Sequence, residues 1–339
     1  MTQWRDRILQ FLPEARIGKI QQNTIDIENK DIVLAMVQSL SQKEYESDVF
    51  SSFGLAVFDE CHHLGAEVFS KSMAKVASKY MLGLSATPDR KDGLRKVFEW
   101  YIGPMVFSSK NEVNKDFIET RIYEYTNDDY QYSKIDKIHT KNGPKPCMPK
   151  MINNISDCIH RNNFINEIIK TEYETGRKIL ILGDRREYLN RTEKWIKENI
   201  NPFIVGQYVG GMKPAELRDS QEKDIILGTY SMASEGMDIP KLNTIVLASP
   251  KSDVVQSVGR ILREKSSVRK FHPLVIDFID THPNLSVFSK QCDKRITYYK
   301  KCNHEIIVYK TDGSQTKIEK RKPRKKKELH EIDICLIED

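Results

Sequence analysis

Short apolar runs rich in β-branched residues recur along the 339-residue chain and predict its strands. Each run is nearly continuous, which is typical of parallel strands covered on both faces. Amphipathic helical patterns lie between the runs, for example over residues 66–80 and 185–200. This alternation predicts an α/β fold of doubly wound, parallel-sheet layers. The predicted strands are residues 31–37, 54–58, 81–85, 178–183, 202–209, 224–229, 243–249 and 273–278.

Residues 109–150 interrupt the alternation, because polar residues and turn formers dominate there. One further strand-like run, residues 117–125, lies inside this stretch. We interpret the stretch as a connector, with room for a small ordered insertion, between two lobes. The predicted organisation is a first lobe (1–108), the connector (109–150), a second lobe (151–290) and a carboxyl-terminal extension (291–339).

Candidate chemistry is concentrated in DECHH (59–63), directly after the strand predicted at 54–58. Ligands of open α/β sheets bind outside the carboxyl ends of the strands. A zinc site fits poorly, because adjacent ligands do not easily close a tetrahedron and no CxxC or HxxxH partner is nearby. A polar strand end without chemistry is a second alternative. We favour a Walker B element, in which one carboxylate holds magnesium and the next polarises the attacking water.

A second polar segment, Ser85-Ala86-Thr87, follows the strand predicted at 81–85. Alone, it is equally well explained as the cap of a turn. Together, DECH followed by SAT resembles motifs II and III of the superfamily 2 helicases. SEGMDIP (234–240) resembles motif V of that family, and QSVGRILR (256–263) resembles motif VI with its QxxGRxxR pattern.

Within the superfamily, the chain is most similar to the XPB/UvsW-like branch, especially helicases of large DNA viruses and phages. The resemblance covers about residues 2 to 310 and includes TQWRDRI (2–8), GLSATPDRKDGL (83–94) and HPLVIDF (272–278). It implies two RecA-like lobes, ATP and Mg²⁺ as cofactors, and nucleic acid, expected to be DNA, as the partner. One departure is Lys91, which stands between Arg90 and Asp92 where the XPB branch has glutamate.

The resemblance also implies roles for single residues of the first lobe. Asp59 would bind the metal, Glu60 would be the general base, and His62 would couple the site to the other lobe. Ser85, Ala86 and Thr87 would link hydrolysis to strand displacement. The expected nucleic-acid contacts lie near three residues of the two lobes, Gln38, Ser39 and Thr229.

In the second lobe, the resemblance places Gly236 and Asp238 near the nucleotide and gives Gln256, Arg260 and Arg263 catalytic roles. The spacing of Arg260 and Arg263 supports their roles independently of the resemblance, because residues three apart on a predicted helix share a face. Two guanidiniums there could clamp a transferring phosphoryl group, as an arginine finger does. An ordinary basic helix face is the alternative.

The phosphate-binding loop GxxxxGK[ST] of this superfamily is not found in the 339 residues. Gly18-Lys19 is followed by Ile20, and the Gly206–Gly211 spacing is followed by Met212, which is typical of a turn. In the family, the loop precedes a segment like TQWRDRI. We therefore expect a first lobe that is incomplete at its amino terminus, through a split gene, an internal start or a gene-model error. Such a lobe would expose a sheet edge and an apolar face, so we expect either a companion polypeptide that carries the loop and supplies the missing strands, or a compromised fold.

The positive charge of the chain is concentrated near its carboxyl end. Eight basic residues and one glutamate lie within residues 317–327 and account for more than the net charge of +6, so the basicity is a tail. It would contact phosphate backbones, or serve as a solubilising or localisation segment. Six cysteines without close pairs, and no apolar run long enough for a bilayer or a secretion signal, predict an intracellular protein with no membrane partner. Host cytoplasm, nucleus and virion all stay open.

Two functions follow from these features. The favoured one is the larger part of an ATP-dependent helicase or translocase that takes its P-loop from elsewhere. The alternative is a catalytically inactive nucleic-acid-binding or interaction protein derived from a helicase.

Overall fold

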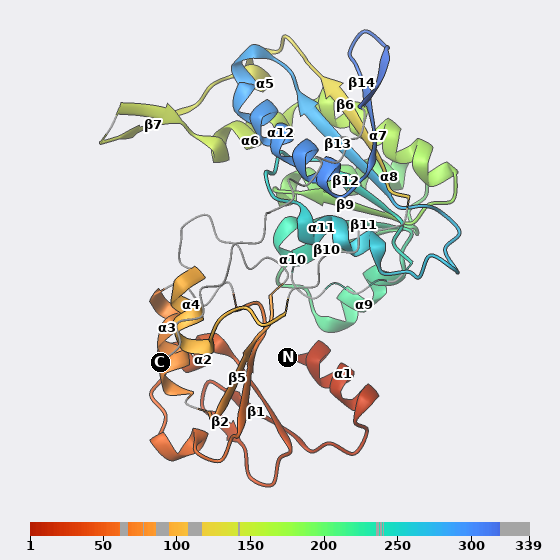
Figure 1. Cartoon of the computed structure of the whole chain (residues 1–339). Helices are drawn as coiled ribbons and strands as arrows, with labels where there is room; N and C mark the ends of the chain where they lie inside the picture. The colour runs from red at the N-terminus through yellow and green to blue at the C-terminus, as the bar shows by residue number, and fades with distance from the viewer. Residues whose placement is uncertain are drawn as a thin grey trace, which may run out of the picture. The chain divides into compact units, whose positions relative to one another are not determined.

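A computed structural model describes residues 1–61, 67–76, 78–85, 95–107, 117–141, 143–234, 237, 239 and 241–318. The chain divides into two compact units, Met1–Lys110 and Asn111–Asp339 (Figure 1). Over the residues described, no helix combines the length and apolar character that crossing a membrane requires.

The first unit contains two small sheets. The elements of the unit are α1 (Thr2–Phe11), β1 (Ile17–Gln21), β2 (Thr24–Asp26), β3 (Ile32–Ala35), α2 (Val37–Gln42), a 3-10 helix (Ser47–Phe50), β4 (Leu55–Phe58), α3 (Glu67–Lys75), β5 (Tyr80–Gly83) and α4 (Arg95–Ile102). In the first sheet the strand order is β2-β1-β3, with β3 parallel and β2 antiparallel to β1. The second sheet is the parallel pair of β4 and β5.

The β4–β5 pair is buried on one face. Phe58 packs into a core with Leu40, Phe50 and Met73. On the other face four apolar residues are exposed, with fractions of 40 to 60%: Leu55, Val57, Tyr80 and Leu82. These strands were predicted to be covered on both faces, and the residues described cover one.

The second unit is built on an eight-stranded sheet. Its elements are β6 (Glu119–Tyr125), α5 (Tyr130–Ser133), β7 (Lys137–Thr140), β8 (Gly143–Pro146), α6 (Met148–Asp157), α7 (Ile159–Glu174), β9 (Ile179–Gly183), α8 (Arg186–Asn199), β10 (Val205–Tyr208), α9 (Pro214–Glu222), β11 (Ile225–Thr229), α10 (Tyr230–Ser234), β12 (Thr244–Leu247), α11 (Val255–Gly259), two 3-10 helices (Arg260–Leu262 and Pro283–Leu285), β13 (Leu274–Asp280), α12 (Ser286–Lys301), β14 (Glu305–Tyr309) and β15 (Gln315–Ile318).

The strand order is β10-β11-β9-β12-β13-β6-β14-β15, and every neighbouring pair is parallel except β14 and β15. Successive side chains of β9 point to opposite faces of the sheet and belong to two different cores. Leu180 and Leu182 belong to the core that contains residues of α10, α11 and α12, whereas Ile179 and Ile181 belong to the core with α7 and α8. Helices therefore cover both faces of the central strands, and the parallel α/β fold expected from the sequence is confirmed (Figure 1).

Parts of the predicted connector and of the predicted carboxyl-terminal extension belong to the large sheet. β6 comes from the predicted connector, yet it lies inside the sheet between β13 and β14. β14 and β15 come from the predicted extension and close the sheet at that end. β6 was not recognised as a core strand because Glu119, Arg121 and Glu124 interrupt its apolar residues. Glu119 and Arg121 pair with each other along the strand, and the fold adds the distant partners His272 for Glu119 and Glu172 for Arg121.

Candidate functional site

The ends of β4 and β5 bring the two polar segments of the first unit together. The strands are parallel, with Phe58 opposite Gly83. Beyond that pair, the Leu84 N–H donates to Phe58 O (2.8 Å), and the Cys61 N–H donates to Leu84 O (2.9 Å). The segments that begin at Asp59 and at Ser85 therefore leave the sheet side by side, at its carboxyl edge.

Asp59 is exposed at this edge and is held from two sides. Its Oδ2 accepts a hydrogen bond from the indole Nε1 of Trp4 on α1 (2.9 Å), and its Oδ1 accepts one from the Glu60 N–H (2.9 Å). Glu60 has a φ of +48°, in the left-handed region that side-chain-bearing residues seldom adopt. Such strained positions are concentrated at functional sites.

Cys61 is part of the core of the first unit. Its side chain is buried, and a Cβ at Gly83 would lie 3.0 Å from its Sγ. Burial, together with the charges of Glu60 and Asp59, raises the pKa of the thiol, so the neutral form is favoured. Within the described part of the chain, no three His, Cys, Asp or Glu side chains gather as a metal cluster.

Magnesium bound with a nucleotide places fewer demands on the protein. Mg²⁺ prefers oxygen ligands and usually keeps several waters, with one or two carboxylates and phosphate oxygens completing the shell. The carboxylates of Asp59 and Glu60, adjacent at a strand end, fit that partial set. Trp4 fixes the orientation of the first of them.

In the second unit, Arg260 joins two of the predicted motifs. It is 9% exposed, and its Nε and Nη1 donate to the carbonyl oxygens of Ala233 (2.6 Å) and Met237 (2.7 Å). Motif VI is thereby bonded to the main chain just before motif V, at Ala233, and within motif V, at Met237. Arg263 is exposed, and Gln256 is half-buried on α11.

The predicted single helix across motif VI is two short elements. α11 ends at Gly259, and a 3-10 helix over Arg260–Leu262 follows with Arg263 at its end. Residues three apart also line up on a 3-10 helix. The environments of the two arginines differ nonetheless, since Arg260 is buried and Arg263 is at the surface.

The predicted nucleic-acid contacts fall in different surroundings. Thr229 ends β11 at the carboxyl edge of the large sheet, with its Oγ1 3.2 Å from Ser231 Oγ. Gln38 is exposed at the start of α2. Ser39 is buried, and its Oγ accepts a hydrogen bond from the Gln22 N–H (3.0 Å), so this hydroxyl has a structural partner. Five predicted site residues lie outside the described residues: His62, Ala86, Thr87, Gly236 and Asp238.

Sequence reasoning missed two buried ion pairs that shape the carboxyl edge of the large sheet. Arg161 forms bonds to both oxygens of Asp280 (2.7 and 3.0 Å) and donates to Ala248 O, just after β12. Arg295 bonds to both oxygens of Asp277 (2.7 and 2.8 Å). The aspartates stand out in the apolar run of β13, but the run alone does not identify their partners.

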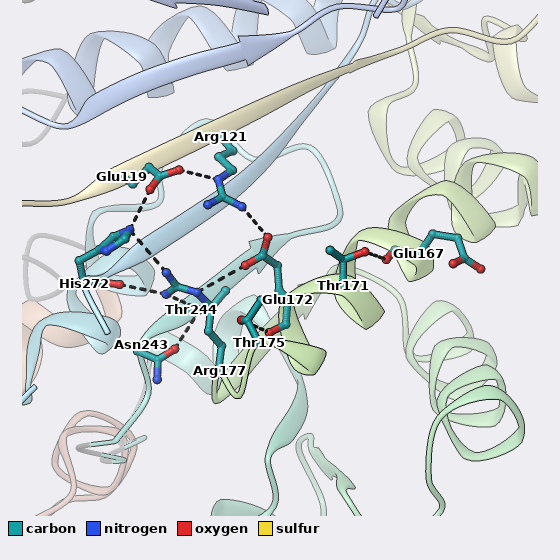
Figure 2. A network of polar contacts seen from close by, with 10 residues as sticks. All are labelled: Glu119, Arg121, Glu167, Thr171, Glu172, Thr175, Arg177, Asn243, Thr244 and His272. Carbon is teal, nitrogen blue, oxygen red and sulfur yellow. Dashed lines mark hydrogen bonds and ion pairs between the residues drawn. The ribbon is translucent and has the colours of Figure 1, made fainter. Parts of the chain in front are cut away.

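A ring of charged groups lies at the opposite, amino edge of the sheet (Figure 2). Glu119 pairs with Arg121 and with His272 Nε2 (2.8 Å). Arg121 pairs with Glu172 of α7, which also pairs with Arg177 (3.4 Å). Burial would raise the pKa of Glu119, but its bonds to Arg121 and His272 lower it overall. The ring ties β6 to α7 and to the starts of β9 and β13.

The sequence motifs resemble those of helicases, and comparison with known proteins identifies the same family. Residues 1–90 match the family described as type III restriction enzyme, res subunit, and residues 160–265 match the helicase conserved C-terminal domain. The chain belongs to the superfamily 2 helicases and is related to those of large DNA viruses and phages.

Individual relatives come from large DNA viruses. The protein L396 of Acanthamoeba polyphaga mimivirus, named as an ATP-dependent RNA helicase, is 38% identical over 90% of this chain and 57% of its own length. Helicase 161L of Invertebrate iridescent virus 6 is 24% identical over 91% of this chain and 70% of its own length. QP509L of African swine fever virus is 26% identical over 90% of this chain and 62% of its own length. The chain thus spans about three fifths of the first of these relatives.

Solved structures support the fold. Saccharomyces cerevisiae Dbp5 bound to RNA and ADP BeF3 aligns with a TM-score of 0.51 and 15% identity, over 89% of this chain and 72% of Dbp5. At that identity the likeness concerns the fold alone. T4 UvsW aligns over 91% of this chain with a TM-score of 0.45, too low to bear on the branch.

Proposed function

We propose that these 339 residues form the larger part of an ATP-dependent nucleic-acid helicase or translocase whose P-loop is supplied by residues outside them. The observation that carries the proposal is the meeting of Asp59, Glu60 and Ser85 at the ends of two adjacent parallel strands. This is the edge at which α/β proteins bind ligands. Membership of a helicase family makes a nucleotide the expected ligand.

In this proposal each first-unit side chain has one task. Asp59 holds Mg²⁺ through water, and Trp4 keeps its carboxylate oriented. Glu60 accepts the proton of the attacking water, and Ser85 with Ala86 and Thr87 couples the site to nucleic-acid movement. When bound, MgATP supplies the phosphoanhydride bond that is cleaved.

In the second unit we assign Gln256, Arg260 and Arg263 to the nucleotide phosphates, as the family resemblance implies. The bonds of Arg260 to Ala233 O and Met237 O make it a positioning residue for the main chain at those two residues as well.

The exposed face of the β4–β5 pair supports the requirement for further polypeptide. Four apolar side chains at alternating positions form a one-sided surface, which a soluble unit seldom leaves to water. We propose that the segment carrying the P-loop packs on this face, whether it belongs to the same polypeptide or to a companion.

The nucleic acid is expected to be DNA from the resemblance to helicases of large DNA viruses and phages. The names of L396 and QP509L point to RNA instead. We propose contacts near Gln38, Ser39 and Thr229, and such contacts to phosphates would be sequence-tolerant and salt-sensitive. At Ser39 the contact would involve the main chain, because its hydroxyl is bonded to Gln22.

A second function is favoured by one observation, the lack of a GxxxxGK[ST] segment in these 339 residues. On that basis, the chain would bind nucleic acid or a protein partner without hydrolysing ATP.

The test is ATPase activity of this chain alone and with a polypeptide that carries a GxxxxGK[ST] loop, each with DNA or RNA added. We expect turnover only with the added polypeptide, stimulated more by DNA. Glu60→Gln should lower that turnover by about 10²-fold or more, since general base catalysis contributes about 10²–10⁴-fold. Glu28→Gln, at an exposed position of the same unit, is the matched control.

Each result decides one part. Turnover by the chain alone would contradict the need for an external P-loop, and stimulation by RNA alone would contradict DNA as the substrate. If the added polypeptide restores nothing, the non-hydrolysing function is the better description.

A further inference from the structure

A two-stranded ribbon, β7 and β8, extends away from the large sheet of the second unit (Figure 1). The strands pair antiparallel, with Lys137 opposite Pro146 and Thr140 opposite Gly143, and they form a sheet of their own. Gly143 has a φ of +95° at the turn. Side chains on both faces are exposed, including Ile138 at 46%. An isolated hairpin is at best marginally stable, so a ribbon kept in this form requires a firm base.

The base of the ribbon is firm. The Cys147 N–H donates to Asp136 O (2.7 Å), and Asn154 Nδ2 of α6 donates to Asp136 Oδ2 (2.7 Å). Below these bonds, the cluster of Tyr132, Met151, Ile152, Ile155, Cys158, Leu285 and Phe288 is buried. The ribbon therefore stands on a small packed core.

This base lies at the carboxyl edge of the large sheet. Arg185, which follows β9, donates to Pro149 O at the start of α6 (2.9 Å), and Tyr132 of α5 donates to Asp280 at the end of β13 (2.9 Å). Thr229 ends β11 at the same edge. The ribbon thus leaves the unit from the side on which an α/β sheet receives its ligand.

The ribbon and the residues that follow it carry positive charge alone. Residues 137–150 include four lysines and one histidine and no aspartate or glutamate. Lys137 and His139 alternate along β7 and share a face, Lys145 lies opposite Ile138 on the other face, and Lys141 is at the turn. All four of these side chains are exposed.

The free edge of β8 is unsuited to a protein strand. Pro144 and Pro146 alternate along it, and proline has no N–H to donate to an added strand. The ribbon also offers little surface to an apolar partner, because Ile138 is its one large apolar side chain. A two-stranded ribbon does fit the major groove of a B-form DNA duplex, and lysines contact its phosphates.

We propose that the β7–β8 ribbon binds the phosphate backbone of the nucleic acid held at the carboxyl edge of the second unit, on its duplex part. The inference rests on the proposed nucleic-acid binding and adds a contact surface that none of the helicase motifs includes. Lys137, Lys141 and Lys145 supply the charge, and the base on α5 and α6 fixes the direction of approach.

The test uses the full 339-residue chain without nucleotide, and fluorescence anisotropy with a labelled duplex and with one of its strands alone. Lys137, Lys141 and Lys145 are replaced by alanine together. The matched control replaces three exposed lysines of α12, Lys290, Lys294 and Lys301, and so removes the same charge from the same unit. Affinity is measured over a range of salt concentrations.

For the duplex, we expect the slope of log K against log salt to become less steep by about 2 to 3 in the ribbon variant, at about 0.9 per phosphate contact. The control slope should stay unchanged, as should the thermal unfolding midpoints of both variants. An unchanged ribbon slope, or an equal change in the control, would overturn the proposal. A change confined to the single strand would overturn the duplex placement. No binding by the unaltered chain would instead count against the proposed function.

Discussion

At the scale of single residues, the two aspartates of β13 have the strongest energetic consequences. Asp277 and Asp280 are completely buried, and each receives two bonds from an arginine. A buried pair contributes little net stability as a pair, but removal of one partner leaves an uncompensated charge. Each pair joins β13 to one helix, α12 or α7, so both faces of the strand are fastened.

Asp280→Asn should therefore lower the free energy of unfolding of the second unit by about 3–5 kcal/mol. Asp157→Asn is a matched control, because Asp157 also bonds to an arginine at 2.7 Å but its side chain is 57% exposed. That change should cost less than about 1 kcal/mol. Urea unfolding followed by Trp195 fluorescence measures both, and equal losses would contradict the interpretation.

His304 gives the second unit a specific pH dependence. Its ring is buried, stacks on Tyr299 and has Nδ1 2.8 Å from Thr120 Oγ1. Burial lowers its pKa from 6.5 to about 4. Between these values the unfolded chain binds a proton that the folded chain does not. The contribution of His304 is thus fully present above pH 6.5 and is lost as the pH falls toward 4.

The expected loss is about 3 kcal/mol by pH 4, from a pKa difference of about 2.5. His304→Gln cannot take up this proton, so its free energy of unfolding should fall less over the same range. The measurement is urea unfolding of both proteins across the range, compared as a difference because carboxylates also titrate. Parallel curves would show that His304 is protonated without penalty.

Residue positions in the motifs could be predicted, whereas their contacts could not. The location of Asp59, Glu60 and Ser85 at strand ends could be predicted because the strands before them are apolar runs. The bond of Ser39 to Gln22, and those of Arg260 to Ala233 and Met237, depend on tertiary neighbours. No local pattern distinguishes a buried arginine from an exposed one three residues on.

At the scale of elements, the β4–β5 pair separates its two faces sharply. Because side chains alternate along a strand, Leu55 and Leu82 are on the exposed face and Phe58 is in the core. Leu55→Ser with Leu82→Ser should change the free energy of unfolding of the first unit by no more than about 0.5 kcal/mol. Light scattering should show less aggregation.

Phe58→Ala on the buried face is the contrast, with an expected loss of about 3–5 kcal/mol. The serine variant should also fail to gain ATPase activity from a polypeptide that carries the P-loop, if that polypeptide packs on the exposed face. A large loss of stability in the serine variant alone would mean that residues of this chain already cover the face.

Strand prediction succeeded where the apolar run was continuous. β9, β11 and β12 lie within their predicted ranges, with ends differing by one or two residues. β14 was missed because three of its five residues are partly exposed and its partner β15 is polar. Periodicity reports burial, so a strand near the edge of a sheet carries a weaker signal than a central one.

At the scale of the whole molecule, the basic tail and the ribbon are separate sources of positive charge. Deletion of residues 319–327 leaves β15 intact and removes seven basic residues. We expect affinity for nucleic acid to fall and the salt slope to become less steep by several units, at about 0.9 per phosphate contact on a duplex. An unchanged slope would assign the tail to solubility or localisation.

The position of β6 has a consequence for synthesis of the protein. The strand is synthesised early, but its hydrogen-bond partners are synthesised much later. Glu119 bonds to His272, 153 positions further along the chain, and Thr120 bonds to His304, 184 positions further along. Contacts so distant in sequence close slowly, and an incomplete chain exposes unpaired strand edges meanwhile. A ribosome must therefore release nearly the entire described chain before the large sheet can be completed.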